Sequence, residues 1–171
     1  EEAEPENLPA PGRIAEAARP EQPELPSVEV GFNAAMTPRI RDQISRVGEN
    51  RVIAQQFHRL GITRFSVEPA YKFGLSEQAR IDPATGKIEV SADVADLSRT
   101  IAHELAHDIS ERLSEESRKT IANYITNNRI EVQRAGGMGE RVADYFADVM
   151  LGNAVAPADI RTLFLQSPLG L

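Results

Sequence analysis

The sequence predicts an α+β domain in which a short antiparallel or mixed sheet precedes a mainly helical C-terminal half. Residues 63–68 and 86–92 alternate apolar and polar side chains, as half-buried strands do. Residues 97–109 then carry an apolar side chain at every fourth position, which is the period of a helix with one buried stripe. The predicted sheet therefore leads directly into this helix.

The first 27 residues differ in kind from the rest of the chain. They contain six of the eleven prolines, and their seven acidic and two basic residues account for five of the seven net negative charges. This composition predicts a disordered, extended lead or linker over 1–27, followed by a single domain over 28–171.

Composition also limits the possible partners. Without its lead the chain is nearly neutral, at net charge −2, which argues against nucleic acid as the main partner. The sequence contains no apolar run of 18 residues, so we expect no membrane span. It contains no cysteine, which excludes disulfides and zinc–thiolate sites without choosing a compartment. The oligomeric state stays undetermined.

The elements ahead of residue 97 follow from periodicity and turn chemistry. Residues 37–60 form a long amphipathic pattern, weakened at Gly48, which predicts a helix that backs the sheet. The strand over 63–68 comes next. Residues 79–82 and 86–92 are expected to pair as a hairpin, because the segment between them has the residues of a turn.

The helix over 97–109 needs a side chain to cap its first backbone N–H groups. Ser91 and Asp93 are the candidate caps, because their side-chain oxygens can accept these hydrogen bonds. Three further helical patterns follow, over 114–132, 139–151 and 157–165, and residues 166–171 form a tail.

The run His103-Glu104-Leu105-Ala106-His107 lies within the helix over 97–109. Side chains four positions apart point from one helix face, so both imidazoles can reach one metal ion. Zinc lowers the pKa of a bound water to about 7 and polarises a carbonyl, while Glu104 can take the proton of that water. The pattern predicts one zinc ion per chain and hydrolysis of peptide bonds. The alternative is an accidental pattern of ordinary surface or core histidines.

A catalytic zinc usually has three protein ligands, so another segment must supply the third. Glu111 continues the same helix face, but it lies about 12 Å along the axis from His103, which is too far. His58, the only other histidine, is interpreted as an ordinary packed or surface residue. The better candidates are acidic residues at spacing four in the helix over 139–151, and any of them could be the ligand: Glu140, Asp144 and Asp148.

The two-histidine helix and this acidic helix together resemble the gluzincin metallopeptidases, whose second helix carries a glutamate ligand and, four residues on, an aspartate. The resemblance covers residues 103–151. Within that group, the stretch Ala143-Asp144-x-Phe146-Ala147 is similar to regulatory peptidases of the ImmA/IrrE type and to some secreted metalloprotease toxins. The resemblance implies a small zincin-like fold, and a peptide or protein as the substrate.

The resemblance also implies a role for each site residue. His103, His107 and Glu140 become the zinc ligands, Glu104 the general base, and Asp144 the acceptor for a histidine N–H, which would fix the imidazole tautomer. Tyr71, in the loop 69–74, is the candidate that steadies the oxyanion. In enzymes of this kind an extended substrate pairs with the strand nearest the cleft, and residues 87–91 would be that strand.

Two questions stay open at this point. The first is whether the chain is instead an inert or latent zincin-fold module that serves binding or structure. Glu104 argues against this, because a purely structural site needs no base there. The second is whether the lead over 1–27 is a solvated tether or a pro-segment whose carboxylates reach the zinc.

Overall fold

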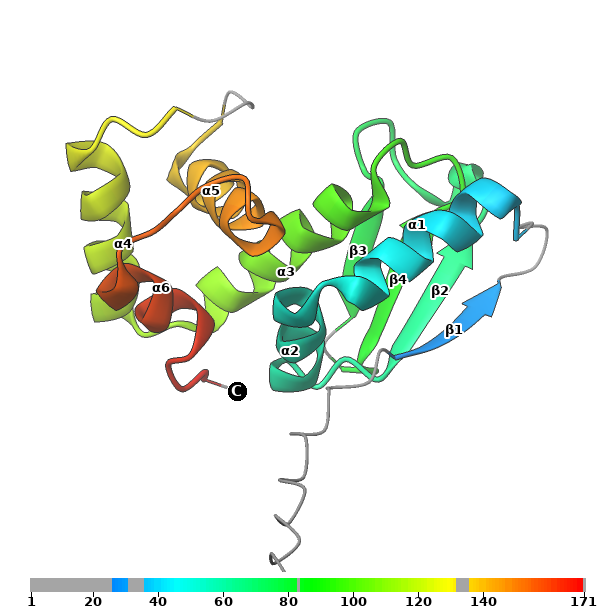
Figure 1. Ribbon diagram of the computed structural model, residues 1–171, viewed down its shortest axis with the longest axis horizontal. Helices are drawn as coiled ribbons and strands as arrows, with labels where there is room; N and C mark the ends of the chain where they lie inside the picture. Colours follow the sequence, from blue (N-terminus) through cyan, green and yellow to red (C-terminus); the bar gives the residue numbers. More distant parts are fainter. Residues whose placement is uncertain (1–25, 31–35, 83, 132–135, 171) are drawn as a thin grey trace, which may run out of the picture.

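The computed structural model describes residues 26–30, 36–82, 84–131 and 136–170. In this part of the chain, six α-helices and a four-stranded sheet form an α+β fold, which confirms the predicted class. The sheet lies at one end of the molecule and helices α4, α5 and α6 lie at the other. Helix α3 runs between the two ends (Figure 1).

The sheet is mixed, with strand order β1-β2-β4-β3. Strands β1 (Ser27–Val30), β2 (Arg64–Glu68) and β4 (Lys87–Ser91) run parallel, and β3 (Ala79–Asp82) pairs antiparallel with β4. The three predicted strands and the hairpin are confirmed. Strand β1 was not predicted, and it begins at the last residue of the predicted lead. Residues 1–25 of that lead lie outside the described residues.

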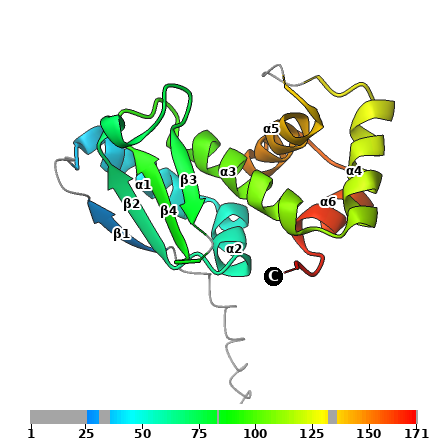
Figure 2. The same ribbon diagram turned by 180° about the vertical axis from the view of Figure 1, so that it is seen from behind.

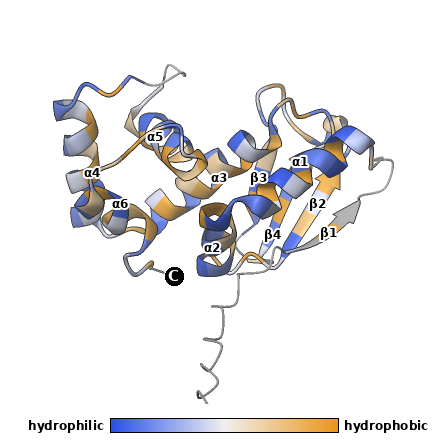
Figure 3. Ribbon diagram, viewed as in Figure 1, coloured by the Kyte–Doolittle hydropathy of each residue, from blue (hydrophilic) through white to orange (hydrophobic). Residues whose placement is uncertain are grey.

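The predicted long helix over 37–60 is two helices, α1 (Pro38–Glu49) and α2 (Arg51–Arg59), and the break lies at Asn50 rather than at Gly48. The Asn50 backbone is extended, and its side-chain oxygen accepts a hydrogen bond from the Ile53 backbone N at 3.1 Å. Asn50 therefore ends α1 and caps α2. Helix α1 runs across one face of the sheet and α2 lies beside the sheet (Figure 2). Figure 3 shows hydrophilic residues on the outer side of α1 and hydrophobic ones in β2.

Helix α3 (Leu97–Arg112) begins after Asp96, whose carboxylate accepts a hydrogen bond from the Arg99 backbone N at 3.0 Å. The predicted caps were wrong, since Ser91 and Asp93 hydrogen-bond to each other between β4 and α3. The predicted apolar stripe is confirmed, and each of its members is at most 1% exposed: Leu97, Ile101, Leu105 and Ile109. This stripe fixes the orientation of the α3 face that carries His103 and His107.

The C-terminal half contains α4 (Glu115–Asn127), α5 (Met138–Leu151) and α6 (Ala158–Leu165). The helix predicted over 114–132 is confirmed as α4, which Ser114 caps, but it ends at Asn127, well before residue 132. The rings of Phe146 and Phe164 stack with centroids 3.6 Å apart, which joins α5 to α6. Among the described residues, no helix combines the length and the apolar character that a membrane span requires.

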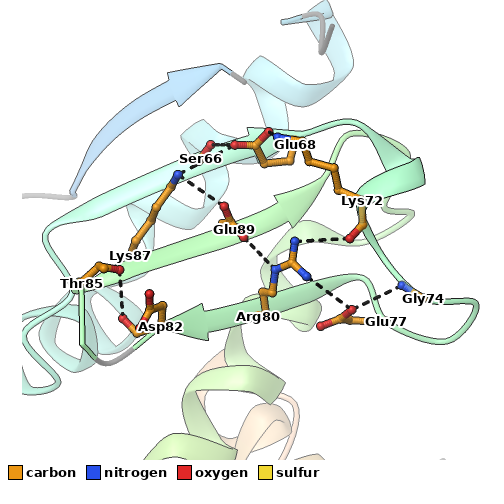
Figure 4. A network of polar contacts seen from close by, with 10 residues as sticks. All are labelled: Ser66, Glu68, Lys72, Gly74, Glu77, Arg80, Asp82, Thr85, Lys87 and Glu89. Carbon is orange, nitrogen blue, oxygen red and sulfur yellow. Dashed lines mark hydrogen bonds and ion pairs between the residues drawn. The ribbon is translucent and has the colours of Figure 1, made fainter. Parts of the chain in front are cut away.

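The face of the sheet opposite α1 carries a network of charged side chains (Figure 4). Glu68 is buried, with Lys72 Nζ 2.8 Å from its Oε2 atom, while Ser66 Oγ donates to its Oε1 atom at 2.7 Å. The hydrogen bond from Lys72, followed by that from Ser66, lowers the pKa of Glu68 below its usual range. Arg80 Nε lies 2.7 Å from Glu89 Oε2, which ties β3 to β4.

We expect Glu68→Gln to make stability less sensitive to acid. A carboxylate whose pKa is lowered in the folded state stabilises the fold above its unfolded pKa, and this contribution is lost as the pH falls through the folded pKa. Tm measured from about pH 7 to about pH 3 should therefore fall less steeply in the variant than in the parent. Equal slopes would show that Glu68 does not determine the acid sensitivity.

Candidate metal centre

Three side chains from two helices converge on one point: His103 and His107 of α3, and Glu140 of α5. The two histidine Nε2 atoms lie 3.1 Å apart. Glu140 places its Oε2 atom 3.2 Å from His103 Nε2 and its Oε1 atom 3.0 Å from His107 Nε2. Two ligand atoms about 2.0–2.1 Å from a tetrahedral zinc ion are about 3.3 Å from each other, so these distances fit one ion. The three residues could hold a metal ion.

The glycines before α5 allow Glu140 to reach the histidines. Glu140 lies in the first turn of α5, which starts after Gly137 with no side-chain cap. A Cβ atom at Gly136 would lie only 2.7 Å from the Glu140 Cβ atom. A side chain at position 136 would therefore push Glu140 out of place, which explains a glycine there.

Asp144 contacts the far side of the His103 ring. Its Oδ1 atom lies 3.0 Å from His103 Nδ1, and the residue is only 1% exposed. A hydrogen on Nδ1 donated to Asp144 leaves the Nε2 lone pair directed toward Glu140 and His107. Asp144 thus contacts His103 on the side of the ring that faces away from the cluster. Glu140 is the carboxylate that lies next to the Nε2 atoms of both imidazoles.

Arg99 belongs to the same arrangement, although sequence reasoning missed it. Its Nη2 atom lies 3.8 Å from Asp144 Oδ1, and its Nη1 atom contacts Asp148 Oδ1. Along α3 the side chains Arg99, His103 and His107 recur every four residues, and they face Asp148, Asp144 and Glu140 on α5. The signal that could have found Arg99 is its position one turn before His103, on the face that meets the acidic line.

We expect Arg99→Gln to weaken zinc binding about tenfold without removing it. Arg99 pairs with Asp144 and Asp148, and residues that orient a ligand through such a partner typically alter metal affinity 10–100-fold. Competition with a chromophoric zinc chelator measures the affinity. The matched control is Arg41→Gln, because Arg41 is exposed on α1. Equal affinity in parent and Arg99→Gln would exclude this positioning role.

Glu104 lies between two cavities that adjoin the cluster. The smaller, of about 260 Å³, is lined by Glu104, His103 and Arg99, and by Gln78, the residue before β3. The larger, of about 690 Å³, is lined by Glu104, both histidines and Glu140, and by residues of β3. Glu104 therefore lines the space next to the cluster from the same helix that carries the histidines.

Tyr71 is not brought to this site. It lies in the short 3-10 helix η1 (Ala70–Lys72), is 72% exposed, and lines neither of the two cavities. Its neighbour Lys72 pairs with Glu68 on the face of the sheet that carries the charged network. Tyr145 is buried, which raises its pKa, and its hydroxyl lies 3.3 Å from the Val155 carbonyl oxygen.

The strand that borders the site is β3 rather than the predicted β4. Strand β4 lies between β2 and β3 and is paired along both edges, whereas β3 pairs with β4 alone among the strands of the described residues. The free edge of β3 faces the cavity beside Glu104 and the cluster. The sequence indicated the hairpin but not which of its arms would pair with β2, because that pairing is non-local.

Comparison with known proteins assigns neither a family nor a function to this chain. A comparison with protein-family models finds no matching family, and comparisons with curated proteins and with solved structures find no match. The likeness to gluzincins therefore depends on the residues between 103 and 151 and on their arrangement in the fold. What the chain itself establishes is an α+β domain with a His-His-Glu cluster that could hold a metal ion.

Proposed function

We propose that this chain is a zinc-dependent metallopeptidase that cleaves internal bonds of a peptide or protein substrate. One observation carries the proposal: the His103 and His107 Nε2 atoms lie 3.1 Å apart, and each is 3.2 or 3.0 Å from one carboxylate oxygen of Glu140, beside Glu104. Two imidazole nitrogens and one carboxylate oxygen are a ligand set of catalytic zinc, which keeps a fourth position for water. Structural zinc sites, in contrast, are closed by four protein ligands.

Each residue of the site has a task in such a reaction. A zinc ion held by the cluster would supply a water of lowered pKa and polarise the scissile carbonyl. Glu104 takes the proton from the attacking water and returns it to the nitrogen of the leaving amine as the C–N bond breaks. Asp144 keeps His103 in the tautomer with the hydrogen on Nδ1, so its Nε2 atom is available for ligation.

The free edge of β3 supports an extended peptide as the substrate. Its unpaired backbone N–H and C=O groups can add one more strand to the sheet. The cavities beside this edge continue in both directions from the cluster, to Asp96 at the start of α3 and to Glu111 near its end. Space on both sides of the cluster can take substrate residues on both sides of the scissile bond, which favours cleavage within a chain over removal of single terminal residues.

Metal content and peptide hydrolysis together test the proposal. Elemental mass spectrometry of the purified chain should find one zinc ion per molecule, and a degenerate library of fluorogenic peptides should reveal cleavage. A chelator should abolish cleavage, and added zinc should restore it. A chain that binds no zinc even when it is supplied would contradict the proposal. Bound zinc without cleavage of any library peptide would instead indicate a binding or structural module.

A further inference from the structure

A third cavity opens beside the cluster, between α3, α4 and α5. Its volume is about 420 Å³, and the cluster residue His107 forms part of its wall. Small or apolar side chains from all three helices form another part of the wall, and exposed charged side chains complete it: Ser110 of α3, Ala122 of α4, and Met138 and Val142 of α5 are the small or apolar ones. Val142 is buried at 5% exposure, whereas Met138 is 36% exposed at the open side. The cavity is therefore an apolar hollow that ends at a candidate metal ligand.

The four charged residues that line this cavity are all exposed, and they are two acidic and two basic residues: Glu111, Glu115, Arg118 and Lys119. Lys119 and Glu115 pair at 2.8 Å, and their side chains are 70% and 75% exposed. Because this pair remains in water and its charges compensate each other, it offers little attraction for a buried charge. The inner wall, in contrast, offers contacts suited to an uncharged hydrocarbon group.

The cavity at the other end of the cluster has the opposite character. It is lined by Arg99, Asp96, Thr100 and Asp144, next to His103. The two ends of the site thus differ: the end at His107 is apolar and the end at His103 is charged and polar. A peptide bound across the cluster would meet a different environment on each side of the bond at the metal.

We propose that the hollow between α3, α4 and α5 is a specificity pocket that takes a large apolar side chain, such as Leu, Met or Phe, from a substrate residue beside the scissile bond. This inference rests on the proposed peptidase function. His107 belongs both to the cluster and to the pocket wall, so a substrate carbonyl at the metal leaves only a neighbouring residue within reach of the pocket. Burial of such a side chain favours it over glycine by about tenfold or more.

Small hydroxamates test the pocket without requiring turnover. The hydroxamate group chelates zinc, and a side chain placed before it (N-acetyl-aminoacyl hydroxamates) or after it (substituted succinyl hydroxamates) samples the two sides of the scissile bond. Calorimetry on the zinc-loaded chain should give a Kd at least about tenfold lower for the leucine side chain than for glycine in one series. The aspartate side chain should bind no better than glycine.

The matched variants are Ala122→Leu, which fills the pocket, and Asn123→Leu on the exposed side of the same helix. Ala122→Leu should abolish the advantage of leucine over glycine and leave the glycine hydroxamate unchanged, which also reports an intact metal site. Asn123→Leu should keep the advantage. Ser110→Leu fills the pocket from the opposite wall and serves if Ala122→Leu does not fold.

The possible failures are distinct. Equal binding of leucine and glycine side chains in both series would overturn the pocket while the metal site and the proposed peptidase remain. An advantage for leucine that survives both pocket-filling variants would also overturn it, because the side chain would then bind elsewhere. No binding of any hydroxamate to the zinc-loaded chain would overturn the metal centre, and with it both proposals.

Discussion

Glu104→Gln is expected to lower kcat for peptide hydrolysis by about 10³-fold, the scale of a lost general base, while one zinc ion per chain is retained. Glutamine keeps the size and the helix position of the side chain but cannot accept the proton of the attacking water. The structure gives a reason to expect zinc to stay: the three atoms that fit one ion come from His103, His107 and Glu140. Steady-state kinetics and elemental mass spectrometry on the same preparation measure both quantities.

A neighbouring carboxylate provides the control for this variant. Glu111 lies on the same helix, is exposed, and lines the larger cavity, but it is not part of the cluster. Glu111→Gln should therefore keep most of the parental kcat. Two results would contradict the assignment of Glu104. Activity close to that of the parent would place the base elsewhere, and loss of zinc would make Glu104 a ligand.

The parts of the site that were predictable are those set by local periodicity. A spacing of four residues places His103 and His107 on one face of α3, and the same spacing aligns Glu140 with Asp144 on α5. Both helices have buried stripes that orient these faces toward each other, and α3 and α5 form the most extensive packing between any two described elements. Helix geometry was therefore sufficient to place the two histidines together and to nominate the acidic line on α5, whereas the choice of Glu140 within that line came from the resemblance to gluzincins.

The parts that were missed depend on pairing between distant segments. Strand β1 is short and follows a Pro-rich stretch, and it is recognisable only through its parallel pairing with β2. The exposure of Tyr71 depends on how the short helix η1 lies between β2 and β3. Arg99 has a role only because Asp144 and Asp148 lie opposite it. Sequence periodicity describes the faces of single elements, whereas these contacts require knowledge of which faces meet.

Glu140→Ala is expected to lower zinc affinity by more than about 100-fold, beyond the 10–100-fold typical of a partner that only orients a ligand. The carboxylate of Glu140 is the one that touches both imidazole Nε2 atoms, at 3.2 Å and 3.0 Å, so its loss leaves two protein ligands. Zinc titrations against a competing chelator measure the affinity. Far-UV circular dichroism establishes that the variant is folded, which is expected because the Glu140 side chain is 42% exposed.

Asp144→Ala is the informative comparison for the same titration. Asp144 contacts the Nδ1 atom of His103 rather than the side of the ring that faces Glu140, so its loss should weaken zinc binding only about 10–100-fold. The ratio of the two affinities then distinguishes a ligand from a residue that orients one. If Glu140→Ala binds zinc like the parent and Asp144→Ala does not, the third ligand is Asp144. The base and the two histidines would then have to work with a metal ion displaced toward the interior of the α3–α5 contact.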